Sequence, residues 1–202
     1  SIGDSDFLEL SLGIGRDELK CDIRYPSENM FEASAEIVKL LHRFKEEEKF
    51  LDRVPITYSF YTHPLTGIVG ERSLVKQFTA GLILQMVALH GYDDLKIGII
   101  HDSSELEWEC MKWLPHCWSD DRMIKYMADT QEELNSLSSH IELVRSIRTS
   151  MPEEELAYEA PYYVFILAGQ RLAEKSEIIK EMYKDRKAVG ISMILLYDEQ
   201  KA

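Results

Sequence analysis

The sequence has few cysteines, no long apolar run and a deficit of positive charge. Only three of its 202 residues are cysteine, Cys21, Cys110 and Cys117, and no two of them form a C-x-x-C pair. A disulfide scaffold is therefore not expected, and a reducing compartment suits the chain better. No apolar run approaches the roughly 18 residues of a membrane span, and no signal-like segment opens the sequence. This part of the protein is expected to be soluble, without inserting into a membrane itself.

The charge balance is strongly acidic. Lys and Arg total 23 against 36 Asp and Glu, which gives a net charge of −13. Such a surplus repels polyanions unless a local basic patch overrides it, and no such patch is evident. Direct binding of nucleic acid is therefore not expected. With 45% hydrophobic and 29% charged residues, the chain is long enough for one domain with a sizeable core, spanning residues 1–202.

Residues 1–60 are predicted to form a hairpin, a helix and an edge strand. Apolar residues alternate with polar ones from Leu8 to Ile14 and again from Leu19 to Tyr25, which predicts a β-hairpin with its turn at Gly15-Arg16-Asp17. Helical spacing follows from Phe31 to Glu48. The alternation from Val54 to Phe60 predicts a further strand, which Pro55 favours at a sheet edge.

Residues 61–202 alternate between strand and helix patterns. Two capping boxes, Ser104 with Glu107 and Thr130 with Glu133, predict helix starts. Strands are predicted at Lys96–Ile100, Tyr162–Leu167 and Val189–Tyr197, and helices at Ser73–His90, where apolar residues on most sides indicate burial, and at Leu172–Tyr183, with an acidic loop at Thr149–Ala160. This order predicts a three-layer α/β fold of the P-loop NTPase-like (RecA/Rossmann-like) kind, with a mostly parallel sheet, helices on both faces and an N-terminal β-hairpin.

The stretch Thr66–Ser73 nearly matches the phosphate-binding pattern G-x-x-x-x-G-K-[ST]. Glu71 replaces the second glycine and puts a carboxylate where backbone N–H groups would surround phosphate. Arg72 replaces the lysine and presents a planar fork instead of a compact ammonium. The simplest alternative is a strand, a glycine turn and a helix. The candidate nucleotide-binding residues of this vestigial site, with weak or absent binding, are Gly67, Gly70, Arg72 and Ser73.

The second half of a nucleotide site is also missing. An NTPase needs an acidic residue at the end of a later apolar strand to hold Mg²⁺ and prepare water. The candidate strand Tyr162–Leu167 runs into Ala168-Gly169-Gln170, without a carboxylate. We therefore predict no catalytic residue, no metal and no cofactor, and not an enzyme. The alternative that stays open is slow ATP/Mg hydrolysis, with Arg72 in place of lysine and a carboxylate such as Asp102 approaching the metal.

Several longer motifs resemble one protein family. They are Gly67-Ile68-Val69-Gly70, the run Leu82–His90, the segment Tyr92–Ile97, Trp108, and the string Trp113-Leu114-Pro115-His116-Cys117-Trp118. Together they resemble the degenerate ATPase-like module of the FtsK/SpoIIIE-type ATPases of type VII secretion systems, the EssC/YukB/EccC group. In that family the module lies between the membrane-spanning segments and the first ATPase module. The resemblance covers roughly residues 8 to 200, and the tryptophan string is its most specific mark.

The resemblance implies a part of a larger, membrane-anchored, hexamer-forming motor that exports small helical-hairpin proteins. This domain would lie on the cytoplasmic side of the membrane and couple the membrane segments to downstream ATPase domains. Its implied partners are neighbouring ATPase modules of the same chain, other subunits of the machine and, through the parent protein, the secreted substrates. The alternatives are a nucleotide-binding sensor or slow ATPase and, least favoured, a DNA-translocase module.

Other residues of reactive type are expected to be structural. The set His101, Cys110, His116 and Cys117 matches no standard zinc spacing. The adjacent residues His101-Asp102-Ser103-Ser104 have the types of a hydrolytic triad, but adjacent residues rarely converge and no nucleophile elbow is present. The large aromatics Trp108, Trp113 and Trp118 are expected mainly in the core, with an exposed docking surface as the alternative. The basic residues Arg122, Lys125, Arg145 and Arg148 are expected on solvated faces.

Overall fold

The chain forms two compact units. A computed structural model describes residues 1–19, 39–40, 42–44, 49–184 and 189–199. One unit is Ser11–Thr57, and the larger unit combines Ser1–Leu10 with Tyr58–Ala202. The first ten residues, which the sequence pattern groups with the N-terminal hairpin, therefore belong to the larger unit.

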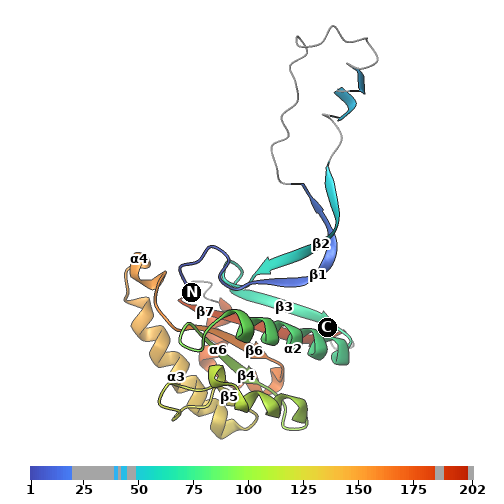
Figure 1. Cartoon of the computed structure of the whole chain (residues 1–202). Coiled ribbons are helices and arrows are strands. Elements are labelled where there is room, and N and C mark those ends of the chain that lie inside the picture. Colours follow the sequence, from blue (N-terminus) through green and yellow to red (C-terminus); the bar gives the residue numbers. More distant parts are fainter. Residues whose placement is uncertain (20–38, 41, 45–48, 185–188, 200–202) are drawn as a thin grey trace. The chain divides into compact units, whose positions relative to one another are not determined.

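The smaller unit is built on a two-stranded antiparallel sheet of β1 (Glu9–Glu18) and β2 (Phe50–Ser59), labelled in Figure 1. The predicted turn at residues 15–17 is wrong, because β1 continues through it and pairs with β2. The Arg16 guanidinium lies over the Phe50 ring at 4.1 Å from its centroid, so cross-strand contacts hold these residues extended. The second predicted hairpin arm beyond Leu19 lies outside the described residues. So does most of the predicted helix from residue 31 to 48, of which residues 39–40 and 42–44 are helical.

The larger unit contains a five-stranded sheet in the order β3-β7-β6-β4-β5. Its strands are β3 (Leu65–Gly70), β4 (Leu95–Ile100), β5 (Met127–Ala128), β6 (Tyr162–Leu167) and β7 (Ile191–Asp198). Every pairing is parallel, so all five carboxyl ends lie along one edge of the sheet. The predicted α/β fold is confirmed.

Helices connect and cover these strands (Figure 1). They are α2 (Arg72–Leu89), α3 (Gln131–Thr149), α4 (Glu153–Leu156), α5 (Gln170–Ala173) and α6 (Glu177–Lys184), with 3-10 helices η2 (Leu106–Trp113) and η3 (Pro115–Cys117). Three expectations need correction. The segment after Ser104 is a 3-10 helix without a side-chain cap, the helix predicted at Leu172–Tyr183 is divided into α5 and α6, and the acidic loop contains α4. Within the described part of the chain, no helix combines the length and apolarity of a membrane span.

The sheet separates two apolar layers. Along β6, Val164 and Ile166 pack in one layer with the N-terminal segment, η2, η3 and α2, which contributes Leu82. The alternate residues Phe165 and Leu167 pack in the other layer with α3, α5 and α6. This alternation follows from the period of two along a strand, and it confirms helical layers on both faces.

Helix α3 begins as predicted and ends on a buried arginine that was not predicted. The Thr130 Oγ1 accepts a hydrogen bond from the Glu133 N–H at 3.3 Å, which confirms this capping box. Near the other end, Arg148 is only 4% exposed, so its expected position on a solvated face is wrong. Its guanidinium donates to the carbonyl oxygens of Pro161 at 2.6 Å and Gly190 at 3.1 Å. Burial is possible because backbone acceptors replace water.

The three tryptophans have different environments. Trp108 is buried in the first apolar layer and Trp118 packs partly against it, as expected for core residues. Trp113 is 82% exposed at the end of η2, so the expectation of a core position is wrong for this residue.

The close packing of Gly98 under Phe165 yields a stability prediction. A Cβ added at Gly98 in β4 would overlap the Phe165 ring, whereas a Cβ at Gly81 in α2 would meet nothing within 4 Å. We expect Gly98→Ala to lower the free energy of unfolding by about 1–3 kcal/mol through overpacking. Gly81→Ala should raise it by about 0.5–1 kcal/mol, because alanine favours the helix interior. Urea unfolding of both variants checks this, and a shift in the same direction for both would contradict it.

Candidate functional site

A cavity of about 700 Å³ opens at the carboxyl edge of the parallel sheet. Its lining includes residues within two positions of the strand ends, among them Arg72 after β3, Asp102 after β4, Asp129 after β5 and Ala168 after β6. Ligands of open α/β sheets bind at this edge. The cavity is therefore the candidate functional site.

The connection between β3 and α2 is a single residue, Glu71. The expected loop from Thr66 to Ser73 is wrong in its extent, because residues 66–70 form strand β3. Gly67 and Gly70 stand in register with Leu195 and Asp198 of β7. The backbone at these glycines is therefore part of a sheet and does not form a loop around a ligand.

Glu71 caps the first turn of α2. Its carboxylate accepts a hydrogen bond from the Ser73 backbone N–H at 3.0 Å and another from the Ser73 hydroxyl at 2.7 Å. These bonds, the side-chain bond first, lower the pKa of the exposed Glu71 carboxyl. A helix N-terminus attracts anions through such free N–H groups. Here an internal carboxylate already fills that position, and its charge opposes a phosphate.

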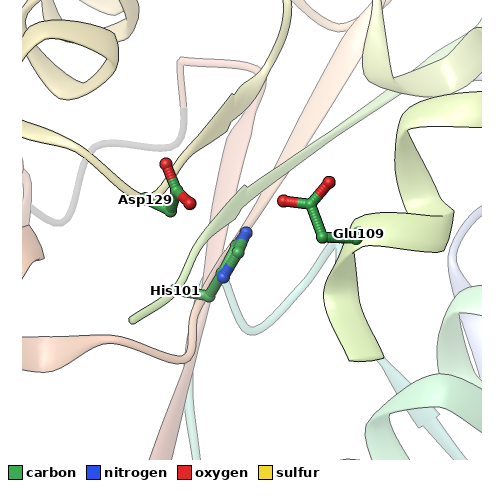
Figure 2. Close-up of side chains that lie close together, drawn as sticks. All are labelled: His101, Glu109 and Asp129. Atoms are coloured by element: carbon green, nitrogen blue, oxygen red, sulfur yellow. The ribbon is translucent and has the colours of Figure 1, made fainter. Parts of the chain in front are cut away.

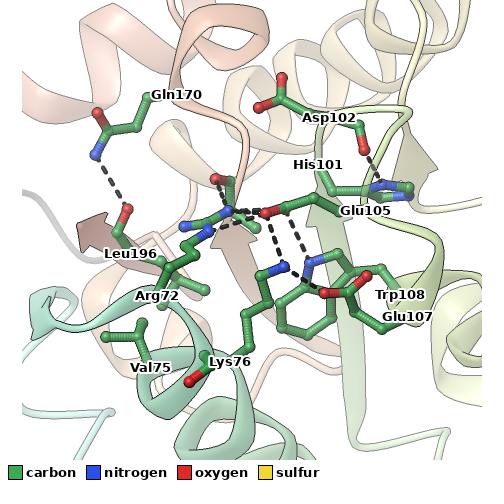
Figure 3. A network of polar contacts seen from close by, with 12 residues as sticks. Arg72, Val75, Lys76, His101, Asp102, Glu105, Glu107, Trp108, Gln170 and Leu196 are labelled. Atoms are coloured by element: carbon green, nitrogen blue, oxygen red, sulfur yellow. Dashed lines mark hydrogen bonds and ion pairs between the residues drawn. The ribbon is translucent and has the colours of Figure 1, made fainter. Parts of the chain in front are cut away.

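Arg72 makes a two-point ion pair with Glu105. Its Nε donates to Glu105 Oε1 at 2.9 Å and its Nη2 to Oε2 at 2.7 Å, while Nη2 also donates to the Ala168 carbonyl oxygen at 2.8 Å (Figure 3). Planar guanidinium and carboxylate groups fit each other in this geometry. The ion pair joins the start of α2, the segment after β4 and the end of β6.

Three further side chains complete what we call the Arg72–Glu105 network: Lys76, Glu107 and Trp108. Lys76 Nζ lies 3.1 Å from Glu105 Oε1 and also pairs with Glu107, and Trp108 Nε1 donates to Glu105 Oε2 at 3.2 Å. Burial acts to raise the pKa of Glu105, but the bonds from Arg72 and Lys76 outweigh it, so the pKa lies below its ordinary value. Burial likewise acts to lower the pKa of Lys76, and its partners outweigh it and raise the pKa. Glu105 and Lys76 are thus both stabilised in their charged forms.

Of the four residues predicted to bind nucleotide, only Arg72 lines the cavity. Gly67 and Gly70 belong to β3, and the Ser73 hydroxyl is bonded to Glu71. Sequence reasoning missed Glu105, which lies 33 residues from Arg72. No local sequence pattern predicts an ion pair between residues so far apart in the chain.

The end of β6 leaves no space for an acidic side chain at Gly169. A Cβ added there would lie 2.7 Å from the His101 carbonyl carbon and 2.8 Å from the Asp102 nitrogen, both backbone atoms. The preceding carbonyl, that of Ala168, accepts the hydrogen bond from Arg72. A carboxylate of the kind that holds Mg²⁺ could therefore not be restored at residue 169 without moving the end of β4.

A second group of polar side chains lies beside the cavity. His101, Glu109 and Asp129 have nitrogen and oxygen atoms within 4.8 Å of one another (Figure 2). Burial, together with the carboxylates of Glu133 and Glu109, raises the pKa of Asp129. Cys117 belongs instead to the core, where burial raises the pKa of its thiol to about 12.

No protein-family model matches the chain. Comparison with individual proteins does find relatives. The chain is 27% identical over 209 residues to the ESX secretion system protein YukB of Bacillus subtilis, covering 100% of this chain and 14% of that protein. It is 28% identical over 207 residues to the ESX secretion system protein EccC of Geobacillus thermodenitrificans, covering 98% and 14%. The chain therefore spans about one seventh of the length of these relatives.

A solved structure shares the fold. It is EssC (ATPases 2 and 3) from Geobacillus thermodenitrificans, with a TM-score of 0.60 at 12% sequence identity, covering 98% of this chain and 34% of that one. An ATPase domain and this chain therefore have a common architecture, at an identity too low to transfer activity.

The Arg72–Glu105 network yields a second stability prediction. The Glu105 side chain is 13% exposed, and Glu105→Gln would leave Arg72 without its carboxylate partner and Lys76 with Glu107 alone. We expect a loss of about 2–3 kcal/mol in the free energy of unfolding. The control Glu107→Gln removes a carboxylate that is 51% exposed and should cost less than about 1 kcal/mol. Equal losses in urea unfolding would show that the network is not centred on Glu105.

The same variant should change the acid dependence of stability. The folded-state pKa of Glu105 lies below its ordinary value of 4.5, so its contribution is complete above that value and is lost as pH falls through the folded-state pKa. The loss caused by Glu105→Gln should therefore be large at about pH 7 and shrink toward about pH 3. A loss that stays constant over this range would contradict the assignment.

Proposed function

The chain is homologous to the type VII secretion ATPases of the EssC, YukB and EccC group, and we propose that it is a non-catalytic, ATPase-like module of such a protein. In this role it lies on the cytoplasmic side of the membrane and couples the membrane segments to downstream ATPase modules during export of small helical-hairpin proteins. The parent is then a membrane-anchored, hexamer-forming motor. The observation that supports the proposal is the Arg72–Glu105 network, which lies at the carboxyl edge of the sheet, where ligands of open α/β sheets bind.

Nucleotide would have to displace internal partners at both halves of the site. To reach a phosphate, Arg72 must leave the Glu105 carboxylate, which it binds at two points. Lys76 would then be the remaining cation that pairs with Glu105 among the described residues. The amide of Ser73 must likewise leave Glu71. Breaking a partly buried ion pair costs more free energy than breaking a surface ion pair. Phosphate binding is therefore opposed both by the Arg72–Glu105 pair and by the hydrogen bond from Ser73 to Glu71. Metal-dependent hydrolysis would also lack an acidic residue at the end of β6, because Ala168 and Gly169 follow that strand.

An exposed apolar stripe on α2 supports the coupling role. Leu74 is 61% exposed, Phe78 37% and Leu89 64%, and the helical period puts them on one side of α2. The expectation that apolar residues bury most of this helix is therefore wrong for that side. Exposed apolar side chains that share one face favour contact with another protein surface. We assign this stripe to a neighbouring ATPase module or another subunit, and secreted substrates reach the domain only through the parent.

The alternative is a nucleotide sensor or slow ATPase, and one observation favours it. The cavity is also lined by Arg171 and Lys175, for which no ion pair is found in the described part of the chain. They offer positive charge that the network does not use. A DNA-translocase role is the weakest candidate, because the net charge is −13.

Calorimetric titration with ATP and ADP, with and without Mg²⁺, separates the first two functions. We expect no binding below millimolar nucleotide in the natural chain, because Glu71 and Glu105 occupy the amide and guanidinium groups. The variant Glu71→Gly with Arg72→Lys frees the helix N-terminus and should bind more tightly. The matched control is Glu132→Gln, which removes an exposed acidic charge from α3. Micromolar, Mg²⁺-dependent binding by the natural chain would sink the non-catalytic proposal.

The α2 stripe provides a test of coupling. We expect Leu74→Asp in the full-length protein to reduce secretion about tenfold or more, as for loss of one interface anchor. Folding should persist, because an acidic residue in the first helical turn suits the helix dipole. The control Gln77→Asp adds the same charge to an exposed position of α2 outside the stripe. Secretion unaffected by Leu74→Asp would remove the stripe from the proposed contact.

A further inference from the structure

His101, Glu109 and Asp129 come from three segments that the fold brings together. Ile100 of β4 stands in register with Ala128 of β5, so the next residues, His101 and Asp129, lie side by side. The His101 N–H donates to the Ala128 carbonyl at 3.0 Å and fixes this arrangement. Glu109 approaches from η2, and the ligand-type atoms of the three side chains lie within 4.8 Å of one another (Figure 2).

The His101 side chain is oriented as a ligand. It is only 2% exposed, and its Nδ1 lies 3.0 Å from the Asp102 carbonyl oxygen. Because a carbonyl oxygen can only accept a hydrogen bond, Nδ1 must carry the proton. Nε2 then carries the lone pair and points toward the two carboxylates (Figure 2). Among the described residues Nε2 has no hydrogen-bond partner. Metal-binding histidines are commonly held in this way, with the second nitrogen bonded to a carbonyl.

The group has more negative charge than its ion pairs neutralise. Glu109 pairs with Lys112 at 2.9 Å, and the neighbouring Glu133 pairs with Lys125 at 2.6 Å. Within the described residues, no Lys or Arg pairs with the Asp129 carboxylate. A cation placed between Asp129, Glu109 and the imidazole would therefore gain attraction that no protein side chain supplies.

We propose that His101, Glu109 and Asp129 bind one divalent first-row transition ion, such as Zn²⁺ or Mn²⁺. One imidazole nitrogen with two carboxylate oxygens is a donor set for such ions, whereas Mg²⁺ prefers oxygen alone. Small side-chain rotations bring the atoms to ligand distances of about 2.0–2.2 Å from a shared ion. Three protein ligands leave positions for water, and Asp129 also lines the cavity, from which the ion can enter.

The bound ion would fasten η2 to the ends of β4 and β5. Glu109 is the only one of the three ligands that η2 contributes, while His101 and Asp129 follow adjacent strands. The site shares no side chain with the Arg72–Glu105 network, so it does not depend on whether nucleotide binds.

Metal titration of the complete, chelator-treated chain tests the proposal. Mn²⁺ binding followed by electron paramagnetic resonance, and Zn²⁺ binding followed by calorimetry, should both give one ion per chain. Glu109→Gln and Asp129→Asn should each weaken binding by about 10-fold to 100-fold. Glu109 is partly exposed on η2, so its variant is expected to fold, and circular dichroism checks this for both.

Two controls distinguish this site from other metal-binding groups. Glu132→Gln removes an exposed acidic charge one residue from Glu133 and should leave the affinity unchanged. Cys110→Ser removes the exposed thiol next to Glu109 and should also leave it unchanged. The proposal is overturned by absence of Mn²⁺ binding at millimolar concentration, by equal affinity in folded Glu109→Gln and the natural chain, or by Zn²⁺ binding that depends on Cys110. In those cases the three side chains form an internal ionic group.

Discussion

The two-point ion pair between Arg72 and Glu105 holds the functional edge of this fold together. Parallel strands end at one edge, where polar groups accumulate and must be satisfied by a ligand, by water or by one another. Here Arg72 and Glu105 satisfy each other, and Glu71 satisfies the Ser73 amide. Arg72 begins α2, Glu105 follows β4 and the Ala168 carbonyl ends β6, so one guanidinium fixes the relative positions of three elements. The Glu71 carboxylate likewise accepts the hydrogen bond of the Ser73 amide at the start of α2.

The parts of the fold that depend on local pattern could be predicted from the sequence. Fully buried strands such as β4 and β6 appear as short continuous apolar runs, because both faces of a parallel sheet are covered. The start of α3 at Thr130 follows from a capping box that acts within four residues. At Ser104 the same pattern did not predict the structure. Its neighbour Glu105 pairs with Arg72 and Lys76, and the 3-10 helix that follows buries Trp108. These are tertiary contacts that the local pattern does not contain.

The candidate site depends on tertiary contacts that no local pattern specifies. Glu105 meets Arg72 across 33 residues, and Arg148 is buried by carbonyl groups 13 and 42 residues away. The His101, Glu109 and Asp129 group depends on the register between β4 and β5, and β5 is only two residues long. Sequence spacing therefore identified the edge where a site belongs and one of its residues, Arg72. It could not indicate that the partner of Arg72 is a carboxylate of the same chain.

This difference in partner has a mechanical consequence. In an active NTPase the helix after the phosphate loop is held partly by nucleotide, so its position responds to binding and hydrolysis. In this chain the corresponding helix, α2, is held by Glu105 and Ala168, which are always present. On the proposed function, the position of α2 relative to β4 and β6 does not depend on nucleotide, and a force applied to the exposed side of α2 passes to the sheet. On that proposal, a parallel sheet whose carboxyl edge is joined to α2 by an internal ion pair is suited to transmitting motion generated elsewhere.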